Sequence, residues 1–276
     1  MSIKKTLEKL NDQLTDRLTD RLTELTAGIT DLTEHVEALR QEIHARFDAS
    51  GVNEKYSDEI LRVLPPPSGM TLSVLEALDA RKTELNFSDE PLSDQQMSNL
   101  LHAADGINRK GNHRTTPTTL DWRENDIYVL KSNGIWRWVP ERRSLLFCVM
   151  HDVRELACVI NVPFSLPPAI LVFVTDFSRT RGVLTETLAS IVPRIHAVGI
   201  DEKDIEVLRR RATALDTGAK IQSVHLAAAA MGLACATCPA VRTERLAEAL
   251  HLRNDEEVCA IALVGNPAKS LLDHIR

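Results

Sequence analysis

The segment PPAILVFVTDF, residues 167–177, constrains the fold more than any other part of the sequence. It is a continuous apolar run of strand length that Pro and Asp bound, without the polar alternation of a strand that has one face in water. A strand of this kind is buried on both faces at the centre of a sheet. The chain therefore requires a sheet that is covered on both sides.

Helical and extended patterns alternate on either side of this segment. Ser93 is a typical N-cap and Gly106 a typical stop for the helix between them. The sum predicts an α+β fold, one mixed sheet with helices against both faces. Helices are expected at 71–81, 92–107, 184–198, 201–216, 216–233 and 242–252, and strands at 126–130, 134–139, around 234–238 and at 258–265, with a strand passing into a helix at 144–156.

The N-terminal residues 1–48 form a separate pattern, a heptad seam with one stutter. Such a helix is polar over most of its circumference and cannot bury its stripe alone, so we expect a coiled coil with another copy of the chain or with another protein. A helix folded back on its own domain is the alternative. The seam runs through Ile3, Leu7, Leu10, Leu14, Leu18, Leu22, Leu25, Ile29, Leu32, Val36, Leu39, Ile43 and Phe47.

Residues 49–69 are interpreted as a linker, because AlaSerGly at 49–51 ends the helix and three successive prolines at 65–67 fit neither a helix nor a central strand. A second domain is then expected over residues 70–276.

Composition excludes several classes of protein. With 39 acidic and 33 basic residues, the net charge of -6 gives no basic stripe for a nucleic-acid backbone. No secretory signal and no apolar run long enough for a membrane span is present, so a cytoplasmic protein is the expectation. The 5 cysteines, an odd number, predict reduced thiols.

Four blocks, in order, carry a resemblance to a known family. The first block, LDARKTELNF at 78–87, is similar to an opening motif with Arg, Ser, a cation and Phe at every second position. The second block, residues 100–122, contains the GINR and RTTPTTLDW segments. An Ala-rich helix at 216–234 and a closing helix and strand at 246–269 follow. Together they resemble the nitroreductase family of FMN-dependent oxidoreductases. The resemblance implies a homodimer with FMN between the subunits, reduced by NADH or NADPH and reoxidised by a small organic acceptor.

The first block then implies contacts to the FMN phosphate. Arg81 stands at the first motif position, Thr83 keeps the hydroxyl of the family's Ser, and Lys82 between them is a further candidate. Leu85 replaces the family's second cation. Lys269, after GNP, is a candidate for the second phosphate contact.

The RTTPTTLDW segment implies contacts to the rest of the flavin. Thr118 and Thr119 keep hydroxyls beside Pro117, whereas Asp121 and Arg123 stand where the family has Asn and Gln. If the following strand extends this far, residues 121 and 123 share a face, and Arg123 neutralises Asp121 or stabilises the anionic reduced flavin. A surface ion pair is the alternative.

Departures at Leu85, Asp121 and Arg123 leave a second hypothesis, a flavin-free interaction or scaffold protein that acts through its coiled coil. Cys235 and Cys238 form a CATC sequence, which we interpret as buried structural thiols; a redox dithiol is the alternative, and no metal site is expected.

Overall fold

The computed structural model describes residues 61–157, 166–180, 202–238 and 243–268. The predicted coiled coil at 1–48, the helix expected at 184–198 and Lys269 lie outside these ranges.

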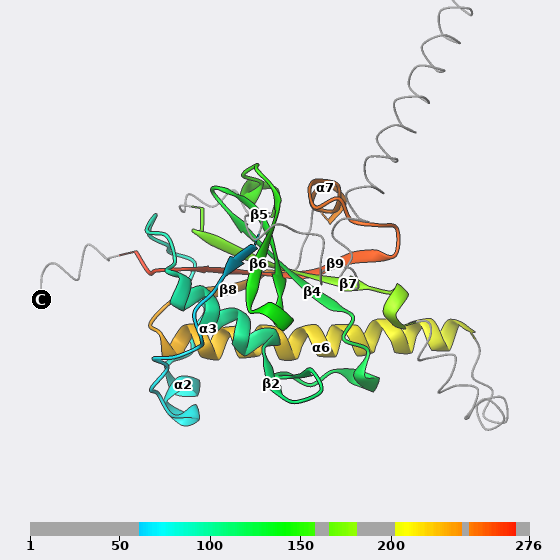
Figure 1. Cartoon of the computed structure of the whole chain (residues 1–276), viewed down its shortest axis with the longest axis horizontal. Coiled ribbons are helices and arrows are strands. Elements are labelled where there is room, and N and C mark those ends of the chain that lie inside the picture. Colours follow the sequence, from blue (N-terminus) through cyan, green and yellow to red (C-terminus); the bar gives the residue numbers. More distant parts are fainter. Residues whose placement is uncertain (1–60, 158–165, 181–201, 239–242, 269–276) are drawn as a thin grey trace, which may run out of the picture. The chain divides into compact units, whose positions relative to one another are not determined.

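One sheet of seven strands forms the centre, in the order β1-β6-β5-β4-β7-β9-β8 (Figure 1). Every neighbouring pair in it is antiparallel. A separate two-stranded hairpin, β2 and β3, lies outside this sheet. The strands are β1 Leu61–Val63, β2 Ile107–Arg109, β3 His113–Arg114, β4 Asn125–Lys131, β5 Gly134–Val139, β6 Ser144–Val149, β7 Ala169–Asp176, β8 Ala234–Cys238 and β9 Glu256–Gly265.

Strand β7 lies between β4 and β9, and all of its residues are buried. Its side chains alternate between two apolar clusters, with Leu171 and Phe173 in one and Ile170 and Val172 in the other. The predicted central strand is confirmed.

Helices cover both faces of the sheet, as expected. Helices α3 and α6 contribute to the cluster that contains Phe173, and α4 and α7 to the cluster that contains Val172. Figure 1 shows α6 along one side of the sheet and α7 on the other. The helices are α2 Val74–Ala80, α3 Asp94–Asp105, α4 Arg154–Ala157, α6 Glu202–Ala230 and α7 Thr243–Ala249, with short 3-10 turns η3 at Thr119–Asp121 and η4 at Pro140–Arg142.

The ends of α3 are as predicted. Ser93 accepts a hydrogen bond from Gln96 N in a capping box, and Gly106 is the C-cap.

Helix α6 corrects the expectation of two helices that meet at Asp216. It runs without a break through Asp216, Thr217 and Gly218. Asp216 and Thr217 are buried, and their side chains bond to neighbouring segments instead of capping a new helix. These tertiary bonds outweigh the cost of about 1 kcal/mol for Gly inside a helix.

The predicted linker also needs a correction, since its last part belongs to the folded domain. Strand β1 pairs with β6, and Leu64 is buried in the core. The proline segment then lies along α3, where Pro65 O accepts a hydrogen bond from Ser98 at 2.5 Å. The prolines lie beyond the strand, as expected for residues that have no backbone N–H to donate to a neighbouring strand.

Within the described residues, no helix is both long enough and apolar enough to span a membrane.

Candidate functional site

The segment after α2 presents a cation to a neighbouring strand. The helix begins with a capping box of Ser73 and Glu76 and ends before Arg81, whose backbone is extended. Glu84 N donates to Cys235 O at 3.0 Å, so the segment runs beside β8. Arg81 is half-buried, and its guanidinium forms no hydrogen bond or ion pair with any described residue. A cation without a counter-ion among these residues favours an anionic ligand.

The same segment contacts the chain after β9. Ser88 N donates to Asn266 O at 2.8 Å, and Ala268 N donates to Asn86 O at 3.0 Å. The residue that precedes Lys269 is therefore hydrogen-bonded to the segment that contains Arg81. Lys269 itself lies outside the described residues.

The other candidates in this segment differ. Thr83 is exposed. Lys82, whose side chain is 75% exposed, lies 3.2 Å from Glu84 in an ion pair. Leu85 packs against the apolar cluster of α4, α7 and β7, so the position of the family's second cation is used for packing.

A buried imidazole lies near Arg81. His225 on α6 is 7% exposed, and its Nε2 is 2.7 Å from the hydroxyl of Thr237. Its Nδ1 is buried without a hydrogen-bond partner among the described residues. Burial and, secondarily, the charge of Arg81 lower the pKa of His225, so the ring is neutral near pH 7.

The second set of candidates surrounds η3, which rests on the middle of α6. Asp216 accepts two hydrogen bonds from Thr119, from the backbone N–H at 2.6 Å and from the hydroxyl at 2.7 Å. The hydroxyl of Thr118 accepts from Arg123 N at 3.2 Å. Thr119 has thus used its donor, whereas Thr118 keeps its hydroxyl proton for another acceptor.

Asp121 and Arg123 form an ion pair, with Arg123 Nε donating at 2.9 Å and Nη2 at 3.0 Å to the carboxylate. The pair was expected, but its predicted cause was wrong. The backbone is not extended here: Asp121 ends η3, and φ is 53° at Asp121 and 51° at Arg123. Two non-glycine residues in the left-handed region store strain, a property that clusters at functional sites.

A buried acid lies beneath this loop. Glu124 is 0% exposed, Oε1 accepts from Asn125 Nδ2 at 2.7 Å, and Oε2 has no partner among the described residues. Burial, and then the negative charge of Asp216, raise the pKa of Glu124 to about 7. Sequence analysis missed this residue, because an acid before a strand gives no sign of burial.

A second buried charge group connects α3 to α6. Lys220 Nζ donates to Asp105 Oδ1 at 2.5 Å, and both side chains are buried. Arg114 lies 3.9 Å from the same oxygen and donates to Glu141 at 2.7 Å. Burial raises the pKa of Asp105, although Lys220 and Arg114 oppose the shift.

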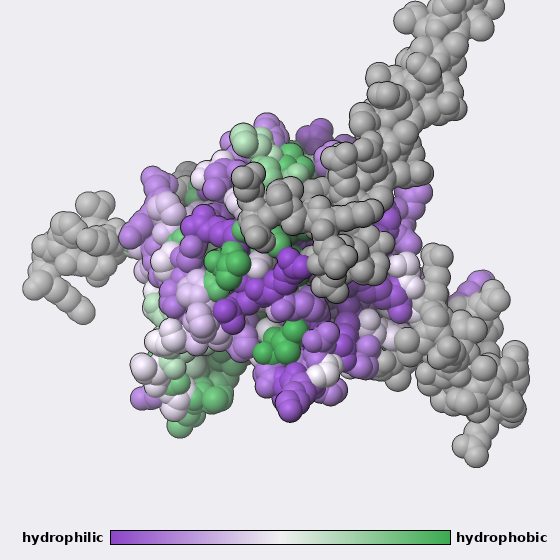
Figure 2. Space-filling model, viewed as in Figure 1, coloured by the Kyte–Doolittle hydropathy of each residue, from purple (hydrophilic) through white to green (hydrophobic). Residues whose placement is uncertain are grey.

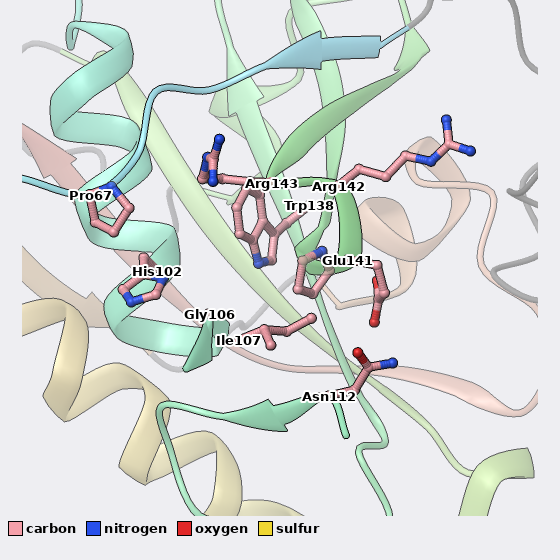
Figure 3. A pocket seen from close by; sticks show the side chains of 10 residues that line it. Pro67, His102, Gly106, Ile107, Asn112, Trp138, Glu141, Arg142 and Arg143 are labelled. Carbon is pink, nitrogen blue, oxygen red and sulfur yellow. The ribbon is translucent and has the colours of Figure 1, made fainter. Parts of the chain in front are cut away.

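A pocket of about 460 Å³ lies at the C-terminal end of α3 (Figure 3). No residue predicted to bind a cofactor lines it. Its lining residues are Pro67, His102, Gly106, Ile107, Asn112, Trp138, Pro140, Glu141, Arg142 and Arg143.

The two CATC cysteines do not form a dithiol. Neither is in a disulfide: on β8, Cys235 lies in the cluster under α6 and Cys238 lies against the cluster on the opposite face of the sheet. Burial raises the pKa of Cys235 to about 12, which keeps it protonated.

Known proteins match this chain in sequence and in structure. A curated protein named "Putative nitroreductase MJ1384", from Methanocaldococcus jannaschii, is 23% identical over 117 residues, 39% of this chain; the match spans 59% of that relative. A crystal structure of a "putative nitroreductase" from Ralstonia eutropha JMP134 has a TM-score of 0.64 at 26% identity, covering 78% of this chain and 93% of that one.

A second crystal structure, of a "putative nitroreductase" from Anabaena variabilis ATCC 29413, has a TM-score of 0.57 at 18% identity and supports the fold. It covers 78% of this chain and 43% of that one. The sequence model described as "Nitroreductase family" matches residues 78–266. These residues contain both sets of candidate contacts except Lys269, and the chain belongs to the nitroreductase family.

Proposed function

We propose that the protein is an oxidoreductase that binds FMN and transfers hydride from NADH or NADPH to a small organic acceptor. The flavin supplies the redox chemistry, and the chain supplies position and charge. Membership of the nitroreductase family supports this class of activity.

The observation that carries the proposal is the guanidinium of Arg81, which has no counter-ion in the part of the chain that the structure describes. A half-buried cation is unfavourable without a counter-ion, and the phosphate of FMN would provide one through charge-assisted hydrogen bonds. Thr83 offers an exposed hydroxyl next to it. Lys269 follows Ala268, which is hydrogen-bonded to the same segment, and is proposed as a second phosphate contact.

Thr118, Thr119, Asp121 and Arg123 are proposed to contact the rest of the flavin. Thr118 would donate its hydroxyl proton. The ion pair holds Arg123 at the loop, where its charge would stabilise the reduced, anionic ring.

We propose a homodimer with FMN between the subunits. An apolar patch on α2 supports association: Val74 is 73% exposed and Leu75 is 69% exposed. Figure 2 shows this patch at the lower left. Patches of this kind mark interaction surfaces.

The flavin-free alternative is favoured by two observations. The carboxylate of Asp121 occupies Arg123 in a bidentate ion pair, and Leu85 packs against the core in place of a cation. A protein with these features would act through association, including association through residues 1–48.

The visible absorbance spectrum of the full-length protein, before and after titration with FMN, separates the two functions. We expect a bound flavin in a ratio of one per chain, bleached by NADH or NADPH without oxygen. A protein that takes up no FMN would leave the interaction protein as the function.

A further inference from the structure

The pocket at the end of α3 carries a cation without a counter-ion. Arg143 Nε donates to Leu64 O at 3.0 Å, but no carboxylate among the described residues forms an ion pair with its guanidinium. Glu141, the acid that lines the pocket, is held by Arg114 at 2.7 Å. A half-buried guanidinium in a pocket favours an anion.

The geometry of the chain holds Arg143 in place. Arg143 is the C-cap of η4 and has a φ of 46°, in the left-handed region. Its backbone carbonyl accepts a hydrogen bond from Leu64 N at 2.9 Å. Arg143 is therefore bonded to Leu64, the residue after β1, through both its backbone and its side chain. The turn and these two bonds fix the position of Arg143.

His102 is a second polar group in this pocket, and Gly106 explains its position. A Cβ at Gly106 would lie 2.1 Å from His102 Nδ1, so only glycine leaves room for the ring. Burial, and then the charge of Arg143, lower the pKa of His102, which keeps the imidazole neutral. A neutral ring still offers one donor and one acceptor.

The pocket is larger than a bare inorganic anion requires. Its volume of about 460 Å³ is in the range of small-molecule sites. Pro67, Ile107 and Pro140 add apolar surface to its lining. Figure 3 shows His102 and Arg143 on the same side of the Trp138 ring, whereas the side chain of Arg142 extends away from that ring.

We propose that this pocket binds a small organic molecule through a phosphate or carboxylate group, held by Arg143 and His102, with its organic part against the prolines and Ile107. The site shares no residue with the proposed FMN contacts, so it is independent of that function.

Isothermal titration of the full-length protein with phenyl phosphate, benzoate and inorganic phosphate tests the proposal. We expect one organic anion to bind saturably, one per chain and tighter than inorganic phosphate; the tighter of the two identifies the anionic group. Arg143→Gly removes the guanidinium and relieves the left-handed strain, and it should weaken binding about tenfold or more. Arg109→Gln, the same loss of charge at an exposed residue outside the pocket, should leave binding unchanged.

Two results would overturn the proposal: neither organic anion binds saturably, or binding is lost in Arg81→Gln and retained in Arg143→Gly. The second result would assign the anion to the FMN phosphate site. If Arg143→Gly does not fold, the imidazole NMR signal of His102, assigned with His102→Gln, decides. A shift that saturates with the ligand supports the pocket, and an unchanged signal contradicts it.

Discussion

The carboxylate of Asp216 accepts both the backbone N–H and the hydroxyl of Thr119, at 2.6 and 2.7 Å. These bonds attach the loop with the proposed flavin contacts to the middle of the longest helix. An Ala at this position has no side-chain acceptor and loses both bonds.

We therefore expect Asp216→Ala to lower the free energy of unfolding by about 2 kcal/mol and to weaken FMN binding. Urea unfolding and flavin titration measure the two effects. Thr119→Ser, which keeps both donors, is the control and should stay close to wild type. Equal stability of Asp216→Ala and wild type would show that the bonds do not hold the loop.

Glu124 predicts a pH dependence of stability. Its pKa is about 7 in the folded protein against an ordinary 4.5, so the folded state binds the proton more tightly. The stabilisation is complete below pH 4.5 and is lost as the pH rises through about 7.

Wild type should lose about 2 to 3 kcal/mol more than Glu124→Gln between pH 5 and pH 8. Denaturant unfolding of both proteins across this range measures the difference, and other titrating groups cancel in the comparison. Parallel pH profiles would mean that Glu124 is ionised throughout.

Breaking the buried pair of Lys220 and Asp105 is expected to destabilise the fold, because one partner would remain buried without the other. Lys220→Met leaves a buried carboxylate without its nearest cation and should cost about 3 to 5 kcal/mol of unfolding free energy. Adding Asp105→Asn removes that charge, so the double variant should recover part of the loss. A double variant less stable than Lys220→Met would contradict this explanation.

Arg81→Gln should weaken FMN binding about 10- to 100-fold, because it removes a charge-assisted contact to the phosphate. Lys82→Gln is the matched control: Lys82 is exposed and paired with Glu84, so its loss should change affinity little. Flavin fluorescence titration measures both. A greater loss of FMN affinity in Lys82→Gln than in Arg81→Gln would assign the phosphate contact to Lys82.

Arg123→Ala should lower the midpoint potential of bound flavin, because a cation at the ring favours the reduced anion. Asp121→Asn leaves Arg123 without its carboxylate and should shift the potential in the opposite direction. Spectroelectrochemistry measures both shifts. An unchanged potential in Arg123→Ala would restrict the pair to a structural role.

The sequence by itself determined the features that depend on local periodicity and local hydrogen bonds. The apolar run at 167–177 specified a central strand, because no face of it tolerates water. Ser93 and Gly106 marked the ends of α3, since caps satisfy backbone groups only a few residues away. Four sequence blocks in order indicated the family, which the match over residues 78–266 confirms.

Only the tertiary structure decided the rest, because these features depend on residues far apart in sequence. Helix α6 is continuous because Asp216 bonds to Thr119, 97 positions away. Glu124 is buried beneath a loop with two left-handed residues, and no local sequence pattern predicts that conformation. The pocket of His102 and Arg143 forms where three segments come together: the residues after β1, the end of α3 and the turn after β5.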